Sequence, residues 1–143
     1  MKCMVVSDST TMRRILENAL LAAGCEDVVV HSDGRVAAEA ADESISAIVT
    51  DWGLPGMDGV ELVRLLRARE DCAGVRVLMV TSRNARTDVE LALEAGVDGY
   101  LLKPFTADAL RYKIDALLQP LLRRDAEPDD TQEAENEDEA RAA

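Results

Sequence analysis

Five short apolar runs alternate with longer segments whose apolar residues recur with a helical period. The apolar runs begin near residues 2, 27, 46, 76 and 99. Helical segments follow them, over about 10–23, over 34–42, after residue 58, over 86–95 and around 110–118. This spacing suits βαβ units and predicts an α/β domain whose parallel sheet is covered on both faces. Pro120 is expected to end or kink the last helix.

The stretch 46–59 combines a buried strand, an acid and a turn. Residues 47–49 are apolar and predict a strand that ends at Asp51. Two glycines, a proline and an Asp-Gly pair follow, so the backbone must turn before Asp58 caps a new helix. Open α/β sheets place their chemistry at the carboxyl ends of strands, which makes Asp51 a candidate functional residue.

Acidic residues are concentrated at the end of the chain. The net charge is −12, and −8 of it falls on residues 125–143, which hold nine acids and one Arg. We therefore expect a folded domain over residues 1–122 and an acidic, disordered tail over 123–143. The charge argues against nucleic-acid binding, because that binding depends on cationic contacts with phosphates.

The three cysteines and the apolar segments indicate the compartment. Cys3, Cys25 and Cys72 are odd in number and share no metal-ligand spacing, which favours core thiols in a reducing cytoplasm. The first residues hold no apolar run long enough for a signal peptide, and no segment reaches membrane-spanning length. The sequence thus predicts a cytoplasmic protein without membrane insertion.

Four polar residues stand at, or just past, the carboxyl ends of different predicted strands: Asp8, Asp51, Thr81 and Lys103. Because these ends share one edge of a parallel sheet, the four side chains are expected to converge. Paired carboxylates suit a hard cation such as Mg²⁺, and a cation with a lysine would neutralise a transferring phosphoryl group. Taken singly, each residue has an ordinary structural explanation. Their joint placement favours phosphoryl transfer onto an acid.

These residues lie in segments that resemble the receiver domains of bacterial response regulators. The matching segments are 5–14, 51–59, 78–81 and 99–105, and the likeness covers roughly residues 1–120. It is strongest to the stand-alone, chemotaxis-type members. The resemblance implies a doubly wound, five-stranded parallel sheet of the CheY/flavodoxin-like type, with strand order 2-1-3-4-5.

The resemblance implies a role for each matching residue. Asp51 would accept a phosphoryl group from the phosphohistidine of a sensor histidine kinase. Asp8, Asp51 and the backbone carbonyl of Gly53 would hold Mg²⁺, while Lys103 and Thr81 would bind the phosphoryl group.

The resemblance also implies how the signal leaves the site. Thr81 would shift toward the phosphate, and Tyr100 would then turn inward and remodel the surface of the fourth helix, fifth strand and fifth helix, where a protein target binds. Without the resemblance, Tyr100 would be interpreted as a half-buried aromatic residue on an edge strand. The Lys103–Pro104 peptide bond is expected to be cis.

Three residues depart from the pattern or vary within it. Ser7 replaces the first acid of an acidic pair that generally reaches the metal through water. We expect weaker Mg²⁺ binding with phosphorylation retained, the alternative being a degenerate receiver that takes no phosphate. Gly53 has no side chain to hold an attacking water, and Arg83 could shield the phosphate, which suggests slow self-dephosphorylation. The alternative is that Arg83 is a solvated loop residue without such a role.

Two functions fit the site. The first is a binding module, not an enzyme, whose affinity for a protein partner changes on phosphorylation. The second is a phosphorelay carrier or phosphate sink between histidine-containing proteins. A phosphatase of the haloacid dehalogenase type requires a second acid where Gly53 stands, which argues against it. Because the last 19 residues are too few for an output domain, we expect a stand-alone regulator. We also expect it to be a monomer.

Overall fold

Five strands and five helices alternate along the chain. The computed structural model describes residues 1–126. The elements in chain order are β1 (Lys2–Val6), α1 (Thr10–Ala22), β2 (Asp27–His31), α2 (Gly34–Ala40), β3 (Ile45–Asp51), α3 (Gly59–Ala68), β4 (Arg76–Thr81), α4 (Arg86–Ala95), β5 (Gly99–Leu102) and α5 (Ala107–Ala126). All neighbouring strands are parallel, in the order β2-β1-β3-β4-β5. The predicted fold class and strand order are confirmed.

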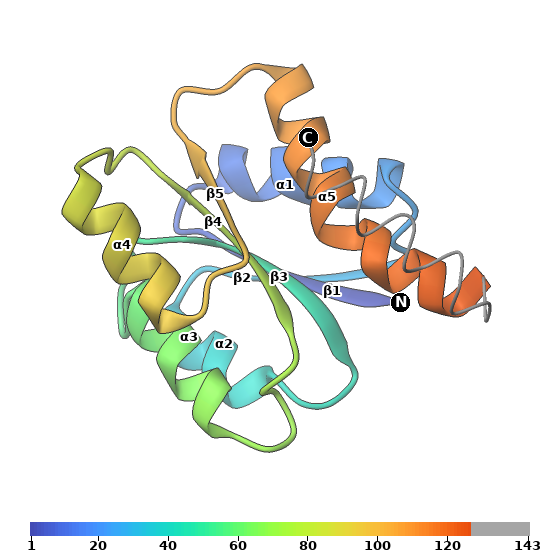
Figure 1. Cartoon of the computed structure of the whole chain (residues 1–143), viewed down its shortest axis with the longest axis horizontal. Helices are drawn as coiled ribbons and strands as arrows, with labels where there is room; N and C mark the ends of the chain where they lie inside the picture. The colour runs from blue at the N-terminus through green and yellow to red at the C-terminus, as the bar shows by residue number, and fades with distance from the viewer. Residues whose placement is uncertain (127–143) are drawn as a thin grey trace.

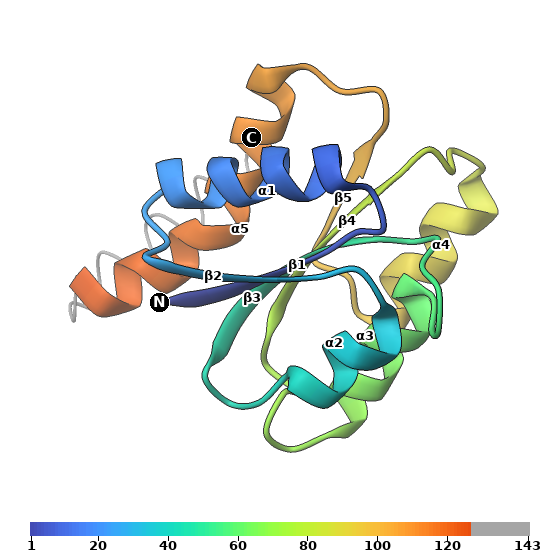
Figure 2. The same ribbon diagram turned by 180° about the vertical axis from the view of Figure 1, so that it is seen from behind.

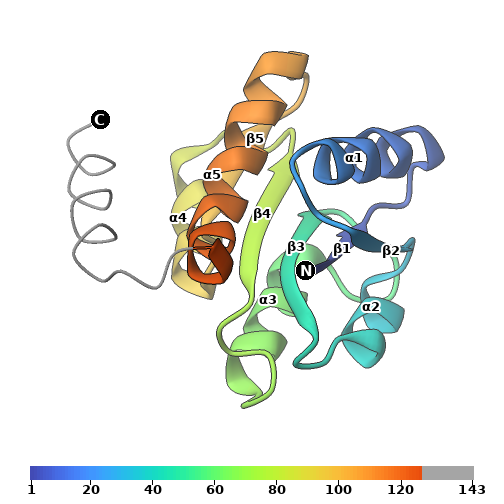
Figure 3. The same ribbon diagram turned by 90° about the vertical axis from the view of Figure 1, so that its right-hand side faces the viewer.

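Helices cover both faces of the sheet (Figures 1 and 2). Helices α1 and α5 lie on one face and α2, α3 and α4 on the other. Figure 3 shows the strands between α1 and α5 on one side and α2 and α3 on the other. Successive side chains of β1 enter opposite layers: Cys3 and Val5 pack under α1 and α5, and Met4 and Val6 under α2 and α3. The inner strands are therefore buried on both faces, which explains their continuous apolar sequences.

All three cysteines are buried thiols, which confirms their interpretation as core residues. Burial, and then the neighbouring Cys25, raise the pKa of the Cys3 thiol. A thiol held in its neutral form is a poor nucleophile and a poor metal ligand. These cysteines therefore contribute to packing.

Side-chain caps begin helices α1 and α3, and a glycine ends α4. The Ser9 hydroxyl accepts a hydrogen bond from the Met12 amide at 3.2 Å and caps α1. Asp58 caps α3 as predicted, accepting from the Glu61 amide at 2.8 Å. Helix α4 ends at Gly96, whose φ of 111° is readily available only to glycine.

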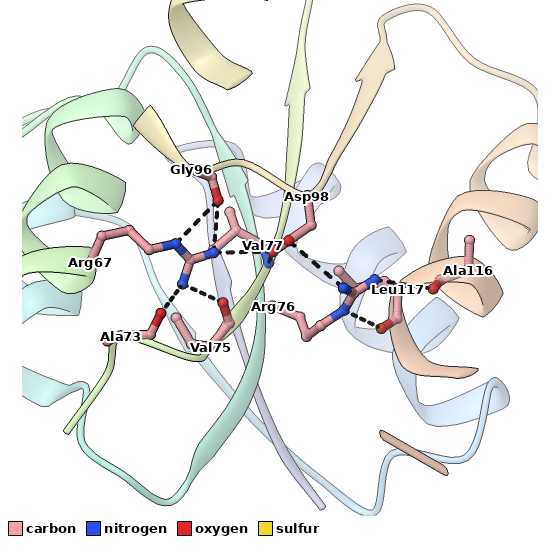
Figure 4. A network of polar contacts seen from close by, with 9 residues as sticks. All are labelled: Arg67, Ala73, Val75, Arg76, Val77, Gly96, Asp98, Ala116 and Leu117. Carbon is pink, nitrogen blue, oxygen red and sulfur yellow. Dashed lines mark hydrogen bonds and ion pairs between the residues drawn. The ribbon is translucent and has the colours of Figure 1, made fainter. Parts of the chain in front are cut away.

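Pro120 does not end α5, which continues to Ala126. Proline has no N–H and so cannot bond the carbonyl four residues earlier, that of Ala116. Arg76 of β4 supplies donors there, to the carbonyls of Leu117 at 3.2 Å and Ala116 at 3.5 Å (Figure 4). The first four residues of the predicted tail are thus helical, and the rest of it lies outside the described residues. No helix in the described part of the chain is long and apolar enough to cross a bilayer.

A second arginine joins several elements at the amino edge of the sheet (Figure 4). Arg67, in the last turn of α3, lies 3.1 Å from the Asp98 carboxylate, which also accepts from the Val77 amide at 2.8 Å. The same guanidinium donates to three backbone carbonyls, those of Gly96, Ala73 and Val75. This network fixes the α4–β5 connection to α3 and β4.

We expect Arg67→Met to lower the free energy of unfolding by about 2–3 kcal/mol, because it removes several charge-assisted hydrogen bonds from half-buried carbonyls. Urea unfolding measures the change. Arg64→Met, on an exposed position of the same helix, is the control and should change stability by less than about 0.5 kcal/mol. Equal losses in the two variants would contradict the role assigned to the network.

Candidate functional site

Asp51 and Lys103 form the centre of the site. Asp51 is the last residue of β3 and is 3% exposed, and its Oδ1 atom lies 3.0 Å from Lys103 Nζ. The same oxygen receives no well-aligned hydrogen bond from any described residue. A buried carboxylate requires such a counter-charge. Asp51 Oδ1 is thus paired by charge but lacks a well-aligned hydrogen bond.

The strand register places the other predicted residues at the same edge. Val6 lies opposite Thr50, and Thr81 lies opposite Leu102. The residues that follow β1 and β5 therefore reach the edge where Asp51 ends β3. Asp8 is exposed there, whereas Thr81 is 5% exposed.

Lys103 is held by the backbone as well as by its charge. Its amide donates to the Thr81 carbonyl at 2.9 Å, which extends the pairing of β5 with β4 by one step. The Lys103–Pro104 peptide bond is cis. The structure thus brings Lys103 to Asp51 from the far side of β4.

Ser7 is fully buried and its hydroxyl is engaged in a turn. Its Oγ accepts from the Ser9 amide at 3.2 Å, and its amide donates to the His31 carbonyl at 3.0 Å. Arg13 Nη1 donates to the Ser7 carbonyl at 2.7 Å. A cation therefore lies beside the position where receiver domains have an acid. Sequence reasoning did not single out Arg13, because its helical position gave no sign that it folds back.

The turn after Asp51 brings the start of α3 against the end of β3. The Gly59 amide donates to the Trp52 carbonyl at 2.7 Å. A Cβ at Gly59 would lie 2.2 Å from the Asp51 carbonyl oxygen, so only glycine permits this approach. The Asp58–Gly59 pair thus supplies a helix cap and the room for the helix to start.

Arg83 is an exposed loop residue whose guanidinium lies over the ring of Trp52. Its Cζ atom is 4.5 Å from the Trp52 ring centroid, and its Nη1 is 3.6 Å from Asp88 Oδ1. Its amide donates to the Thr81 hydroxyl oxygen at 3.1 Å. That hydroxyl keeps its own proton to donate. The partners Trp52 and Asp88 were missed from the sequence, since nothing local connects them to Arg83.

Tyr100 is half-buried, and its hydroxyl donates to the Arg83 carbonyl at 2.7 Å. Burial raises the pKa of Tyr100, the charge of Asp88 raises it further, and Arg83 opposes this by lowering it. The predicted switch tyrosine thus faces the segment between β4 and α4, and the charges of Asp88 and Arg83 act on its hydroxyl.

The donor set fits a hard divalent cation. No group of three His, Cys, Asp or Glu side chains suited to a metal occurs within residues 1–126. The predicted ligands are instead two carboxylates, of Asp8 and Asp51, and the Gly53 carbonyl. All are oxygen ligands, and the buried Asp51 Oδ1, which lacks a well-aligned hydrogen bond, is the kind of atom that a cation would satisfy.

The doubly wound sheet, with a buried acid paired to a lysine at its carboxyl edge, defines an α/β domain with its candidate site at the topological switch point. The chain matches the response regulator receiver domain over residues 3–115. It is 39% identical over 120 residues to the chemotaxis protein CheY homolog of Campylobacter jejuni, covering 82% of this chain and 92% of the relative. It is 40% identical over 120 residues to the chemotaxis protein CheY of Pseudomonas aeruginosa, covering 83% and 97%.

The chain therefore belongs to the response regulator receiver domain family, whose members act in two-component signalling, and the resemblance stated from its motifs is confirmed. Among solved structures, it is similar to the chemotaxis response regulator CheY4 of Vibrio cholerae, with a TM-score of 0.72, 28% identity and coverage of 82% of this chain and 98% of the other. It is also similar to the receiver domain of sensor histidine kinase PA1611 of Pseudomonas aeruginosa, with a TM-score of 0.69, 28% identity and coverage of 82% and 97%.

Proposed function

We propose that Asp51 is the phosphoacceptor of this receiver domain and that its phosphorylation changes the affinity of the chain for a protein partner. The ion pair between the buried Asp51 carboxylate and the partly exposed Lys103, 3.0 Å long, is the observation that supports this most directly. It combines a nucleophilic carboxylate with a cation placed to neutralise an incoming phosphoryl group.

In the proposed reaction, a carboxylate oxygen of Asp51 attacks the phosphorus of a phosphohistidine on a sensor histidine kinase. The new O–P bond forms as the N–P bond breaks, and the electron pair stays on the imidazole nitrogen, which is then protonated. Lys103 balances the charge on the phosphoryl oxygens, and the Thr81 hydroxyl donates a hydrogen bond to one of them.

Asp8, Asp51 and the Gly53 carbonyl would hold Mg²⁺ in this site. When bound, Mg²⁺ would neutralise charge shared by the carboxylates and the phosphoryl group. The PA1611 receiver domain, a structural neighbour, has a magnesium ion coordinated in its active site cleft. The likeness, together with the oxygen-only donor set, supports Mg²⁺ as the cofactor.

The proposed output surface is formed by α4, β5 and α5. Large apolar side chains are exposed on these elements: Leu91 at 38%, Leu93 at 54%, Leu102 at 43% and Tyr112 at 71%. Exposed apolar side chains are typical of surfaces that bind other proteins. Tyr100 connects this surface with the site, because its hydroxyl donates to the carbonyl of Arg83, two residues after Thr81.

A second candidate function is a phosphorelay carrier or phosphate sink. The same residues would serve it, since transfer back to a histidine reverses the first reaction. Rapid loss of phosphate from Asp51 to a histidine phosphotransfer domain would favour the carrier. Tighter binding of a target by the phosphorylated chain would favour the switch.

Incubation with a small acyl phosphate and saturating Mg²⁺ should add one phosphoryl group to Asp51, detected by mass spectrometry of peptides. Asp51→Asn should take none, because an amide is not a nucleophile of this kind. Lys103→Met should be labelled more slowly, since the phosphoryl oxygens lose the cation that balances their charge. Absence of label on Asp51 in the unmodified chain would refute the proposed function.

Ser7→Asp should bind Mg²⁺ more tightly. A carboxylate about 6 Å from a cation contributes at most about 3 kcal/mol per pair of unit charges at an effective dielectric of 20, and screening reduces this, so we expect about a tenfold gain. Titration of Mg²⁺ against Trp52 fluorescence measures it. Ser7→Asn is the control, because asparagine has nearly the size of aspartate but no charge. Equal affinities in all three chains would reject the expectation.

We also propose that the phosphorylated chain loses its phosphate slowly, because Gly53 cannot hold an attacking water. A Cβ at Gly53 would have nothing within 4 Å, so a side chain fits. Gly53→Asn should speed the decay about fivefold, the equivalent of one hydrogen bond of about 1 kcal/mol. Gly74 is equally open, and Gly74→Asn should leave the rate unchanged. Faster decay in the unmodified chain than in Gly53→Asn would contradict the proposal.

A further inference from the structure

Arg83 is the residue through which four parts of the site meet. Its backbone amide donates to the Thr81 hydroxyl oxygen at 3.1 Å, and its carbonyl accepts from the Tyr100 hydroxyl at 2.7 Å. Its guanidinium carbon lies 4.5 Å from the centroid of the Trp52 ring, and Nη1 lies 3.6 Å from the Asp88 carboxylate. One residue thus contacts the neighbour of the acceptor, the end of β4, the edge strand β5 and the first turn of α4.

The two halves of Arg83 have different functions in this arrangement. The backbone half makes the hydrogen bonds to Thr81 and Tyr100, but it belongs to a short connection between β4 and α4 with exposed residues. The side-chain half is attached to rigid neighbours, because Trp52 is 4% exposed and Asp88 lies within α4. The side-chain contacts therefore restrain the backbone that presents the carbonyl to Tyr100.

We propose that Arg83 latches the switch in an engaged form, defined here by the bond from the Tyr100 hydroxyl to the Arg83 carbonyl, through contacts that need no phosphoryl group. Its guanidinium, shared between Trp52 and Asp88, holds the Arg83 carbonyl where the Tyr100 hydroxyl bonds to it. A cation over an indole and a partly exposed ion pair are each modest interactions. Together they favour the engaged form by about three- to tenfold. The opposing effects of Arg83 and Asp88 on the pKa of Tyr100 agree with this placement of charges.

This inference deepens the proposed function and rests on it for its meaning, since Tyr100 is part of the proposed output surface. A switch that is already partly engaged binds its target appreciably in the unphosphorylated state. Phosphorylation then raises the affinity for the target by a smaller factor than in a chain whose Tyr100 is not bonded to the Arg83 carbonyl. The reason is that a larger fraction of the molecules already has the engaged form.

Fluorine NMR of the chain labelled with fluorotyrosine tests the latch without a phosphodonor. The chain has two tyrosines, and Tyr112, 71% exposed, is an internal reference. Arg83→Met removes both side-chain contacts, and Asp88→Asn removes only the ion pair. Arg86→Met is the matched control, because that arginine is 92% exposed and pairs with Glu90 at 3.0 Å.

Arg83→Met should move the Tyr100 resonance toward that of a solvent-exposed tyrosine and increase its solvent isotope shift, with a smaller change in Asp88→Asn and none in Arg86→Met. An unmoved Tyr100 resonance in Arg83→Met overturns the latch, and so does an equal movement of Tyr112, which would indicate a general loss of structure. Because no phosphate is used, failure to label Asp51 leaves this result unaffected. If Asp51 is labelled but the Tyr100 resonance does not move in Arg83→Met, the latch is refuted and the proposed function is not.

Discussion

The site depends on one constraint: a carboxylate buried at the end of a central strand must be paired with a cation. Asp51 is 3% exposed and has Lys103 Nζ at 3.0 Å. Because β3 and β5 are separated by β4, the pair forms only if all three strands are parallel and in register. The backbone bond from Lys103 to Thr81 fixes that register at its last step. The arrangement of the three strands thus sets the distance between Asp51 and Lys103.

The two edges of the sheet differ in how firmly their connections are held. At the amino edge, Arg67 and Arg76 satisfy backbone carbonyls and converge on Asp98, which anchors the start of β5 and the end of α4. At the carboxyl edge, the residues that connect β4 to α4 are exposed, and the Arg83 side chain contacts Trp52 and Asp88. Exposed connections with few contacts are the parts of a fold that open most readily, so the carboxyl edge is held less firmly than the amino edge.

The sequence predicted those features that local pattern determines. Each strand begins within one residue of its expected start, and Asp58 caps α3 as expected. The course of α5 beyond Pro120 was not predictable, because the donors that compensate for the proline come from Arg76, more than forty residues earlier. The stacking of Arg83 on Trp52 was hidden for the same reason, since it joins two connections that only the folded sheet brings together.

The change at Ser7 acts on two electrostatic terms of opposite sign. Loss of a carboxylate weakens the attraction for a divalent cation, but it also removes a repulsion against a phosphoryl group of charge about −2. Arg13 contributes in the same direction, because its guanidinium lies 2.7 Å from the Ser7 carbonyl. In the proposed reaction, less of the neutralisation would therefore fall on the metal and more on Lys103 and nearby guanidinium groups. This is why a site with one acid fewer is still expected to accept phosphate.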